Sequence, residues 1–190
     1  MLSNLRPALT LLALFTFITG IAYPLAVTAA AQLAFPEQAN GSLIHRDGRV
    51  LGSSLIAQPF TGERYFWGRP SATTPGPNNA SASSGSNLGP TNPALSSAVN
   101  ERVTALRTSS PEQGAMAIPV DLVTSSASGL DPQISPAAAL YQVPRVAKAR
   151  GLSEDRVREL VLQHIESRTF GVLGEPRVNV LLLNLALDGL

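Results

Sequence analysis

The chain has 190 residues, no cysteine, 14 basic and 13 acidic side chains. The lack of cysteine excludes a disulfide framework, a thiol nucleophile and a cysteine-based metal site. Thirteen of the basic residues and all 13 acidic residues lie from Glu37 onward, and this near-neutral balance argues against nucleic-acid binding, which needs a basic face.

An uncharged, largely apolar segment opens the chain, and its most apolar part runs from Ala8 to Val27. About 20 helical residues span a ~30 Å hydrocarbon core, so we predict one transmembrane anchor within residues 1–35 and one extracytoplasmic α+β domain at 36–190. Arg6 and the amino terminus place the N-terminal side in the cytoplasm by the positive-inside rule. A cleaved signal peptide is the alternative, because Thr28–Ala31 offers small residues, but the apolar run exceeds a usual signal sequence.

Two short segments after the anchor flank a turn signal. Leu43–Arg46 and Val50–Ile56 flank Asp47-Gly48, a dipeptide favoured in two-residue hairpin turns because both residues tolerate a positive φ. We therefore predict a β-hairpin here, with His45 as a surface residue of its first strand.

Aromatic residues gather between Phe60 and Trp67, and Arg69 follows closely. We interpret the group as a small core cluster that Arg69 covers. Aromatic residues and arginine also concentrate at the cores of protein interfaces, so Trp67 and Arg69 are candidates for a docking surface as well.

The stretch 71–93 is rich in Ser, Asn, Gly and Pro, a composition that predicts a long loop without its own core. Four of its residues could present backbone N–H groups to an anion and form a candidate nucleotide site: Ser84, Gly85, Ser86 and Asn87. The stretch lacks the lysine and the placement of a P-loop. Alternatively, its Gly-Pro and Asn-Pro pairs only set turns before a helix from about Pro93 to Arg107.

A short apolar strand is predicted from Val120 to Val123, and a turn follows at Gly129 and Asp131-Pro132. Asp121 and Asp131 are the carboxylates that could act as a catalytic pair, as in glycosidases. Asp-Pro is also a common turn pair, and we prefer structural roles for both aspartates and for Arg145, which could pair with either.

A helix start is predicted at Ser135, a good N-cap residue followed by a proline at the first helical position. Pro144 should kink or break this helix, because its ring clashes with the carbonyl of Leu140. Gly151 should end it.

The clearest amphipathic pattern covers Ser153 to Arg168, where apolar residues recur at helical spacing. His164 lies on that stripe and is expected to be a half-buried packing residue. The last apolar run, Val178 to Leu187, fits both a helix stripe and strand alternation, and Pro176 just before it favours a helix.

Three blocks resemble a known family, the C subunits of Kdp-type high-affinity potassium-transporting P-type ATPases. They are SSGSNLGPTNPAL at Ser83–Leu95, the segment Pro119–Arg150, and GEPRVNVLLLNLAL at Gly174–Leu187. The resemblance covers essentially the whole chain, including its apolar N-terminus. The chain has Gly85-Ser86 where a Gly-Gly pair is expected.

The resemblance implies a non-catalytic accessory subunit of an ATP-driven potassium uptake complex in the bacterial inner membrane. It implies three kinds of partner: a potassium-channel-like subunit that binds the ion, an ATP-hydrolysing P-type subunit, and a small single-helix subunit. It implies a protein that stabilises the assembly and acts as a catalytic chaperone, raising the ATP affinity of the catalytic subunit. No cofactor is then held firmly, and ATP is reached through the complex.

The residues by themselves leave two other classes open. One is an anchored extracytoplasmic hydrolase that uses Ser84 or the two aspartates, although no histidine is evidently placed as a base for Ser84. The other is an anchored solute-binding module. We assign no catalytic residue and no metal ligand. With the domain outside the membrane and nucleotide inside, we expect any influence on ATP to act from the outer face.

Overall fold

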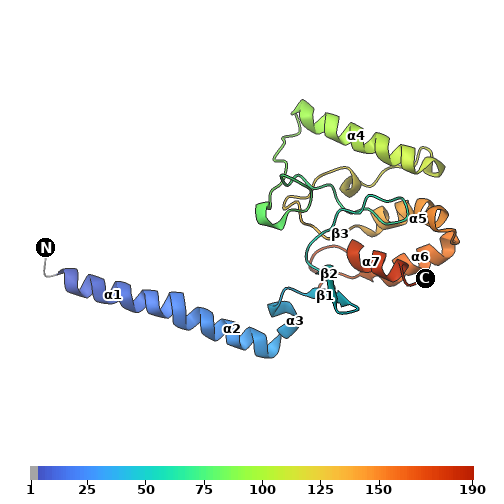
Figure 1. Ribbon diagram of the computed structural model, residues 1–190. Coiled ribbons are helices and arrows are strands. Elements are labelled where there is room, and N and C mark those ends of the chain that lie inside the picture. The colour runs from blue at the N-terminus through green and yellow to red at the C-terminus, as the bar shows by residue number, and fades with distance from the viewer. Residues whose placement is uncertain (1–3) are drawn as a thin grey trace. The chain divides into compact units, whose positions relative to one another are not determined.

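The computed structural model describes residues 4–190, and the chain forms two compact units that divide between Leu51 and Gly52. The first unit begins with a helix that runs without a break from Leu5 to Ala34, as Figure 1 shows. It consists of α1 (Leu5–Phe17), a π-helical turn (Ile18–Ala22) and α2 (Tyr23–Ala34). The helix therefore extends further than the predicted apolar portion.

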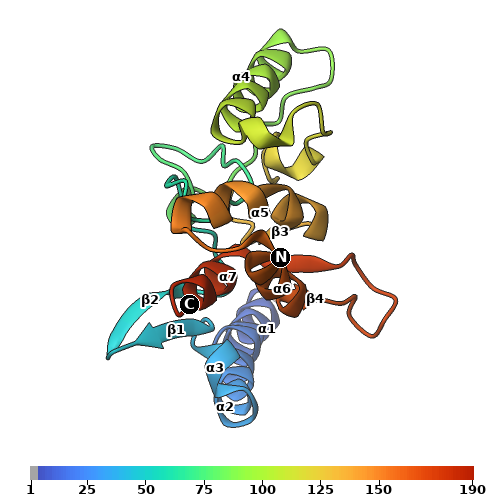
Figure 2. The same ribbon diagram turned by 90° about the vertical axis from the view of Figure 1, so that its right-hand side faces the viewer.

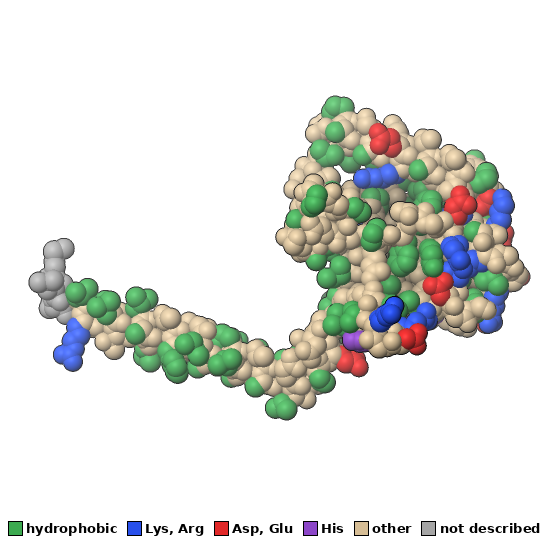
Figure 3. Space-filling model, in the orientation of Figure 1, with side chains coloured by type: hydrophobic (Ala, Val, Ile, Leu, Met, Phe, Trp, Pro, Cys, Tyr) green, Lys and Arg blue, Asp and Glu red, His purple; other side chains and the backbone are tan. Residues whose placement is uncertain are grey.

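The helix Leu5–Ala34 has a mean hydropathy of 1.9 over its most apolar window, and none of that window is buried inside the protein. Figure 3 shows hydrophobic side chains along it and basic ones only at its N-terminal end. By length and composition it is able to cross a membrane. The hydroxyls of Thr10 and Thr19 donate to backbone carbonyls one turn earlier, at 2.9 and 2.6 Å, so neither is left unpaired in a lipid environment.

The π-helical turn has a local cause in the sequence. Pro24 carries no N–H and cannot donate to the carbonyl of Gly20. The hydrogen-bond ladder widens to the i→i+5 pattern just before the proline, at Ile18–Ala22. The helix continues beyond Pro24 for three turns, so the proline does not end it.

A short helix, α3 (Pro36–Ala39), and a hairpin of β1 (Leu43–Arg46) and β2 (Arg49–Ser53) follow the long helix. Asp47 and Gly48 both have positive φ, 52° and 73°, the conformation that a two-residue hairpin turn requires. The predicted hairpin is confirmed. Its second strand begins one residue earlier and ends three residues sooner than the pattern suggested.

The second unit is a mixed α+β domain, which confirms the predicted fold class. Its helices and strands are α4 (Pro93–Ser109), β3 (Gln133–Ile134), α5 (Pro136–Arg150), α6 (Glu154–Gln163), β4 (Ile165–Glu166), β5 (Arg177–Asn179) and α7 (Val180–Leu187). Single 3₁₀ turns lie at Ala80–Ala82, Pro111–Gln113 and Val120–Leu122. Figure 2 shows α5, α6 and α7 gathered beside the short strands.

The sheet of this domain has the order β3-β5-β4, with both neighbours antiparallel to the central strand. Val178 of β5 lies opposite Ile134 of β3 and Ile165 of β4. All three side chains belong to or pack against the main core, and Val178 is completely buried. The strands are very short, so packing of these side chains against the helices is what stabilises the sheet.

Three expectations about the elements are wrong in part. The segment predicted as a strand at Val120–Val123 is a 3₁₀ turn, and Val120 is 69% exposed. The amphipathic helix that starts after Ser153 ends at Gln163, because the chain then enters β4. The last apolar run contains both a strand and a helix. Asn179, the last residue of β5, is the N-cap of α7 and accepts from the N–H of Leu182 at 3.2 Å.

Helix α5 has the predicted start and end. The hydroxyl of Ser135 accepts from the N–H of Ala138, and Gly151 adopts the left-handed conformation at the C-cap. Pro144 lies inside the helix and does not break it. An interior proline costs about 3 kcal/mol, and burial of eight residues of this helix offsets that cost.

Candidate functional site

We call residues Phe60–Trp67 the aromatic segment; its chain turns at Gly62–Tyr65, and two buried amide side chains fix its last two residues. Gln142 of α5 accepts from the N–H of Trp67 at 2.8 Å and donates to the carbonyl of the same residue at 3.1 Å. Asn184 of α7 makes the equivalent pair of bonds to Phe66, at 2.8 and 2.9 Å. The two amides thus satisfy the backbone N–H and carbonyl groups of Phe66 and Trp67, which no neighbouring strand pairs. Phe66 is held fully buried in the core.

Arg145 of α5 adds a third attachment for the same segment. Its guanidinium donates to the carbonyls of Glu63 and Tyr65, the latter at 3.1 Å, and to Oε1 of Gln142 at 2.7 Å. Its Cζ lies 4.0 Å from the centre of the Trp67 ring, within the range of a cation–π interaction. Arg145 is 3% exposed, its bond to Gln142 is buried, and its bonds to the two carbonyls are partly buried.

The charge of Arg145 is balanced by backbone dipoles, without a bonded carboxylate. Burial lowers the pKa of Arg145 to about 10, while the carboxylates of Glu63 and Glu112 act in the opposite direction. The residue therefore remains a cation at neutral pH. The prediction that Arg145 pairs with Asp121 or Asp131 is wrong, because both aspartates bind other groups.

The two aspartates fix local structure through different partners. Asp131 forms an ion pair with Arg69 at 3.1 Å, and its other oxygen accepts from the N–H of Gln133 at 3.0 Å. Asp121 accepts from the N–H of Ser135 at 2.7 Å and from its hydroxyl at 3.2 Å. Asp121 therefore stabilises the N-cap of α5. Both oxygens of each carboxylate are thus engaged by groups of the fold.

The stretch 71–93 is a long loop, as predicted, and hydroxyl groups within it organise its first part. The hydroxyl of Ser71 accepts from the N–H of Asn78, and that of Thr73 accepts from the N–H of Asn79, both at 3.0 Å. Asn78 also donates from its side chain to the carbonyl of Gly129 at 3.1 Å. The loop is thus fastened to the segment that precedes β3.

The candidate nucleotide residues 84–87 lie on the second part of this loop. Three of them are exposed and Gly85 is half-buried. A Cβ on Gly85 would come within 2.8 Å of the carbonyl oxygen of Ala127, and a Cβ on Gly129 would come equally close to the carbonyl oxygen of Ser84. Close packing of two backbones thus explains why glycine occupies position 85. Contact with nucleotide by these residues remains a prediction.

A cleft of about 330 Å³ opens between the aromatic segment, the loop and α4. Its wall includes Phe60, Trp67 and Leu106, and two arginines, Arg69 and Arg102, lie at its polar side. Trp67 and Arg69, the docking candidates from the sequence, therefore face one concave surface. Both arginines also bind groups of the 123–131 segment, so the cleft has a rigid polar edge.

The histidines have no shared site. His45 is exposed on β1, and His164 is half-buried, as expected, with Nδ1 2.8 Å from the carbonyl oxygen of Leu160. Among residues 4–190, no three His, Asp or Glu side chains lie together as a set of metal ligands.

Sequence reasoning missed the two amides that position the aromatic segment. Gln142 and Asn184 are 0% and 1% exposed, and each interrupts an apolar stretch of a helix, in ALYQVP and LLNLAL. A single amide among buried apolar residues needs partners within the fold. This pattern could have indicated from the sequence that both amides are buried and hydrogen-bonded, although it does not indicate which groups they bind.

Comparison with known proteins decides the family. The model for "KdpC: K+-transporting ATPase, c chain" matches residues 5–189. A potassium-transporting ATPase KdpC subunit from Sorangium cellulosum is 66% identical over 189 residues, covering 100% of this chain and 99% of the relative. One from Methylococcus capsulatus is 62% identical, with both chains fully covered.

The chain belongs to the KdpC family. A third relative with the same printed name, from Rhodopseudomonas palustris, is 60% identical over 199 residues and covers 99% of this chain. The resemblance drawn from the three sequence blocks is confirmed, and it extends over the apolar helix as well as the domain. In this KdpC chain, the buried arginine and the two amides hold the segment that forms one wall of the cleft.

Proposed function

We propose that this KdpC chain is an accessory subunit of a potassium-transporting ATPase complex in the bacterial inner membrane. Other subunits would bind the ion and hydrolyse ATP, and this chain would stabilise their assembly. The observation that supports the proposal is the family match over residues 5–189, which takes in the apolar helix and the domain together. The helix Leu5–Ala34 supplies the single anchor.

The proposal places the domain on the extracytoplasmic side. Arg6 lies in the first turn of the apolar helix, while the first basic residue after the helix, Arg46, is followed at once by Asp47. The positive-inside rule then favours a cytoplasmic start of the helix. With this topology, residues 84–87 face an anion or a partner surface outside the cell, away from cytosolic ATP.

The chain would raise the ATP affinity of the catalytic subunit by conformational coupling. A subunit that binds one conformation of its partner more tightly shifts the partner toward that conformation. If the favoured conformation also binds ATP better, the two binding events help each other, typically by 5–150-fold. No direct contact between this chain and nucleotide is then needed.

The experiment compares the ATPase complex with and without this chain. Co-expression with the other subunits should yield one stable complex that contains the full chain. Omitting the chain should raise the KM for ATP by roughly 5–150-fold, and adding back the purified full chain should restore it. An unchanged KM in a stable complex that lacks the chain would contradict the coupling, and failure to co-purify would contradict the accessory role.

The topology gives a separate prediction, measured by thiol labelling. The chain has no cysteine, so one introduced thiol is a clean reporter. Leu55→Cys, at a site 61% exposed on the domain, should react with a membrane-impermeant maleimide in cells whose outer barrier is opened. Asn4→Cys, at the N-terminal end of the membrane helix, should react only after lysis.

The control for the labelling is Ser126→Cys, at a site 3% exposed, which should react only after denaturation. The reverse order of labelling at positions 55 and 4 would place the domain in the cytoplasm. Residues 84–87 would then become the leading nucleotide contact.

A further inference from the structure

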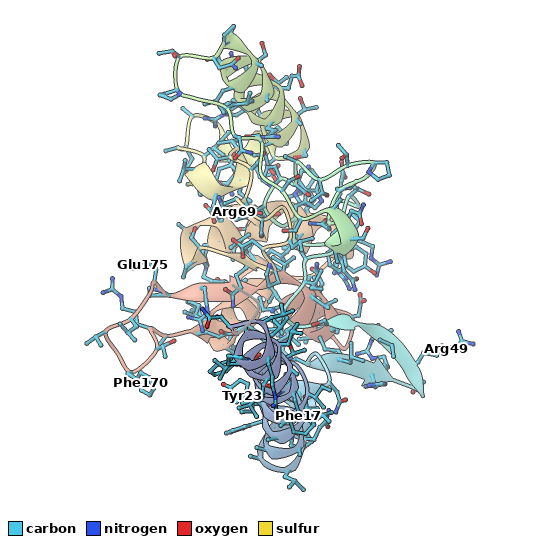
Figure 4. All side chains as sticks on the ribbon, turned by 90° about the vertical axis from the view of Figure 1, so that its left-hand side faces the viewer. Phe17, Tyr23, Arg49, Arg69, Phe170 and Glu175 are labelled. Carbon is cyan, nitrogen blue, oxygen red and sulfur yellow. The ribbon has the colours of Figure 1, made fainter. Side chains whose placement is uncertain are left out.

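A turn of apolar residues projects from the domain between β4 and β5. We call residues 169–174 the apolar tip. Phe170 is 89% exposed, Val172 72% and Leu173 58%, so three large apolar side chains lie in water within four consecutive positions. Figure 4 shows Phe170 at the far end of the turn, on the side away from the strands. Single exposed apolar residues are ordinary, but a contiguous group of this kind marks an interaction site.

The backbone of the apolar tip is well defined. The N–H and carbonyl groups of Thr169 and Leu173 exchange two hydrogen bonds, both at 2.9 Å, and the N–H of Gly171 donates to the carbonyl of Arg168 at 3.0 Å. Phe170 has a φ of +54°, a left-handed conformation that is disfavoured for a bulky side chain. The fold thus keeps a phenyl group outward at a position where glycine or asparagine would be easier to accommodate.

The stem below the tip carries balanced charge. Arg168 pairs with Glu175 at 2.6 Å, and Arg177 pairs with Glu166 at 3.0 Å. Segments that dock on lipid surfaces usually carry unbalanced Lys or Arg, which anionic lipids attract. Here each arginine is neutralised by a glutamate across the stem. The charge pattern therefore favours a protein surface over a lipid surface.

We propose that the apolar tip inserts into an apolar pocket on another subunit of the potassium-transporting ATPase, with Phe170 as the central anchor. This proposal rests on the proposed function, because it needs a multi-subunit complex. A rigid aromatic side chain on a preformed turn loses little conformational freedom on docking, and such residues commonly dominate interface energetics. The neutral stem forms the polar rim around the buried anchor.

The test uses a photoreactive benzoyl-phenylalanine placed at position 170 of the full chain, co-expressed with the other subunits and irradiated in membranes. The tip should form a covalent adduct with another subunit. The matched control carries the same group at Val120, which is 69% exposed on a 3₁₀ turn of the same domain, and should form none. An adduct only with lipid or with a second copy of this chain overturns the proposal.

Co-purification of the wild-type chain keeps the two proposals separate. A stable complex without any adduct at position 170 overturns the docking of the tip and leaves the accessory role intact. Failure of the wild-type chain to co-purify overturns both.

The variant Phe170→Asn distinguishes docking from a structural role. Asparagine tolerates the left-handed conformation, so the unfolding midpoint of the isolated full chain should stay the same or rise. Its affinity for the rest of the complex should fall by about 10–100-fold, as for a hot-spot residue. A lowered unfolding midpoint with unchanged affinity would show that Phe170 serves only the fold.

Discussion

Replacing Arg145 by alanine is expected to lower the free energy of unfolding of the domain by about 3–5 kcal/mol. The change leaves the carbonyls of Glu63 and Tyr65 without their donor and removes the cation from the face of the Trp67 ring. A hydrogen bond from a charged donor contributes about 1.5–3 kcal/mol, and a desolvated cation–π contact contributes about 2 kcal/mol. The aromatic segment should then detach from α5 before the rest of the domain unfolds.

Trp67 is the single tryptophan of the chain, so its fluorescence in a urea titration of the full chain in detergent reports this segment directly. Lys148→Ala, at an exposed position of the same helix, is the matched control and should change the free energy of unfolding by less than about 0.5 kcal/mol. Arg145→Lys should be intermediate, because an ammonium keeps the charge but not the planar fork. Equal midpoints for Arg145→Ala and Lys148→Ala would show that the cluster does not stabilise the domain.

Replacing Asn184 by leucine is expected to lower the free energy of unfolding by about 2–5 kcal/mol. The two side chains have similar size, so packing is largely kept while two hydrogen bonds to Phe66 are lost. Both the N–H and the carbonyl of that residue would be buried without a partner. Because the substitution is more apolar, any destabilisation reports the lost hydrogen bonds.

Asn100→Leu is the control for this change, since Asn100 is an exposed residue of α4. Its effect should stay within about 0.5 kcal/mol. The measurement is again the urea midpoint from Trp67 fluorescence, with the slope of the transition compared between variants. If Asn184→Leu were as stable as the wild type, Phe66 would have to be fixed by packing alone.

Local signals in the sequence predicted the parts of the fold that local chemistry decides. The Asp47-Gly48 turn, the cap residues Ser135 and Ser153, and the helix beginning at Pro93 are all confirmed. Each depends on groups only a few residues apart. The apolar N-terminal helix was predicted for the same reason, because its length and lack of charge need no tertiary partner.

The sheet could not be predicted in this way. Its strands are two or three residues long, too short to show alternation, and β5 exists because Val178 meets Ile134 and Ile165 from other parts of the chain. The same applies to Arg145. Its partners are backbone carbonyls about eighty positions earlier. Every residue has such a carbonyl, so the sequence does not indicate which ones bind the arginine, whereas the two aspartates suggested ion pairs that do not form.

The exposure of the apolar tip could not be predicted from the sequence for a different reason. The 169–174 segment contains two glycines, Gly171 and Gly174, which are typical of turns, but the sequence does not show that Phe170 and its neighbours lie outside the core. Apolar residues next to an amphipathic helix are usually assigned to that core. Only the structure separates Leu160, which is buried, from Phe170, which is exposed.

The hydrogen bonds between Asn184 and Phe66 join residues 118 positions apart in the sequence. This separation limits how early in synthesis the domain can fold. A ribosome makes the aromatic segment long before it makes β5 or α7. Before β5 and α7 are made, Phe66 lacks the Asn184 amide and β3 lacks its neighbouring strand. The aromatic segment and β3 therefore cannot yet form their native contacts. The domain can therefore complete its fold only after its C-terminal elements have been synthesised.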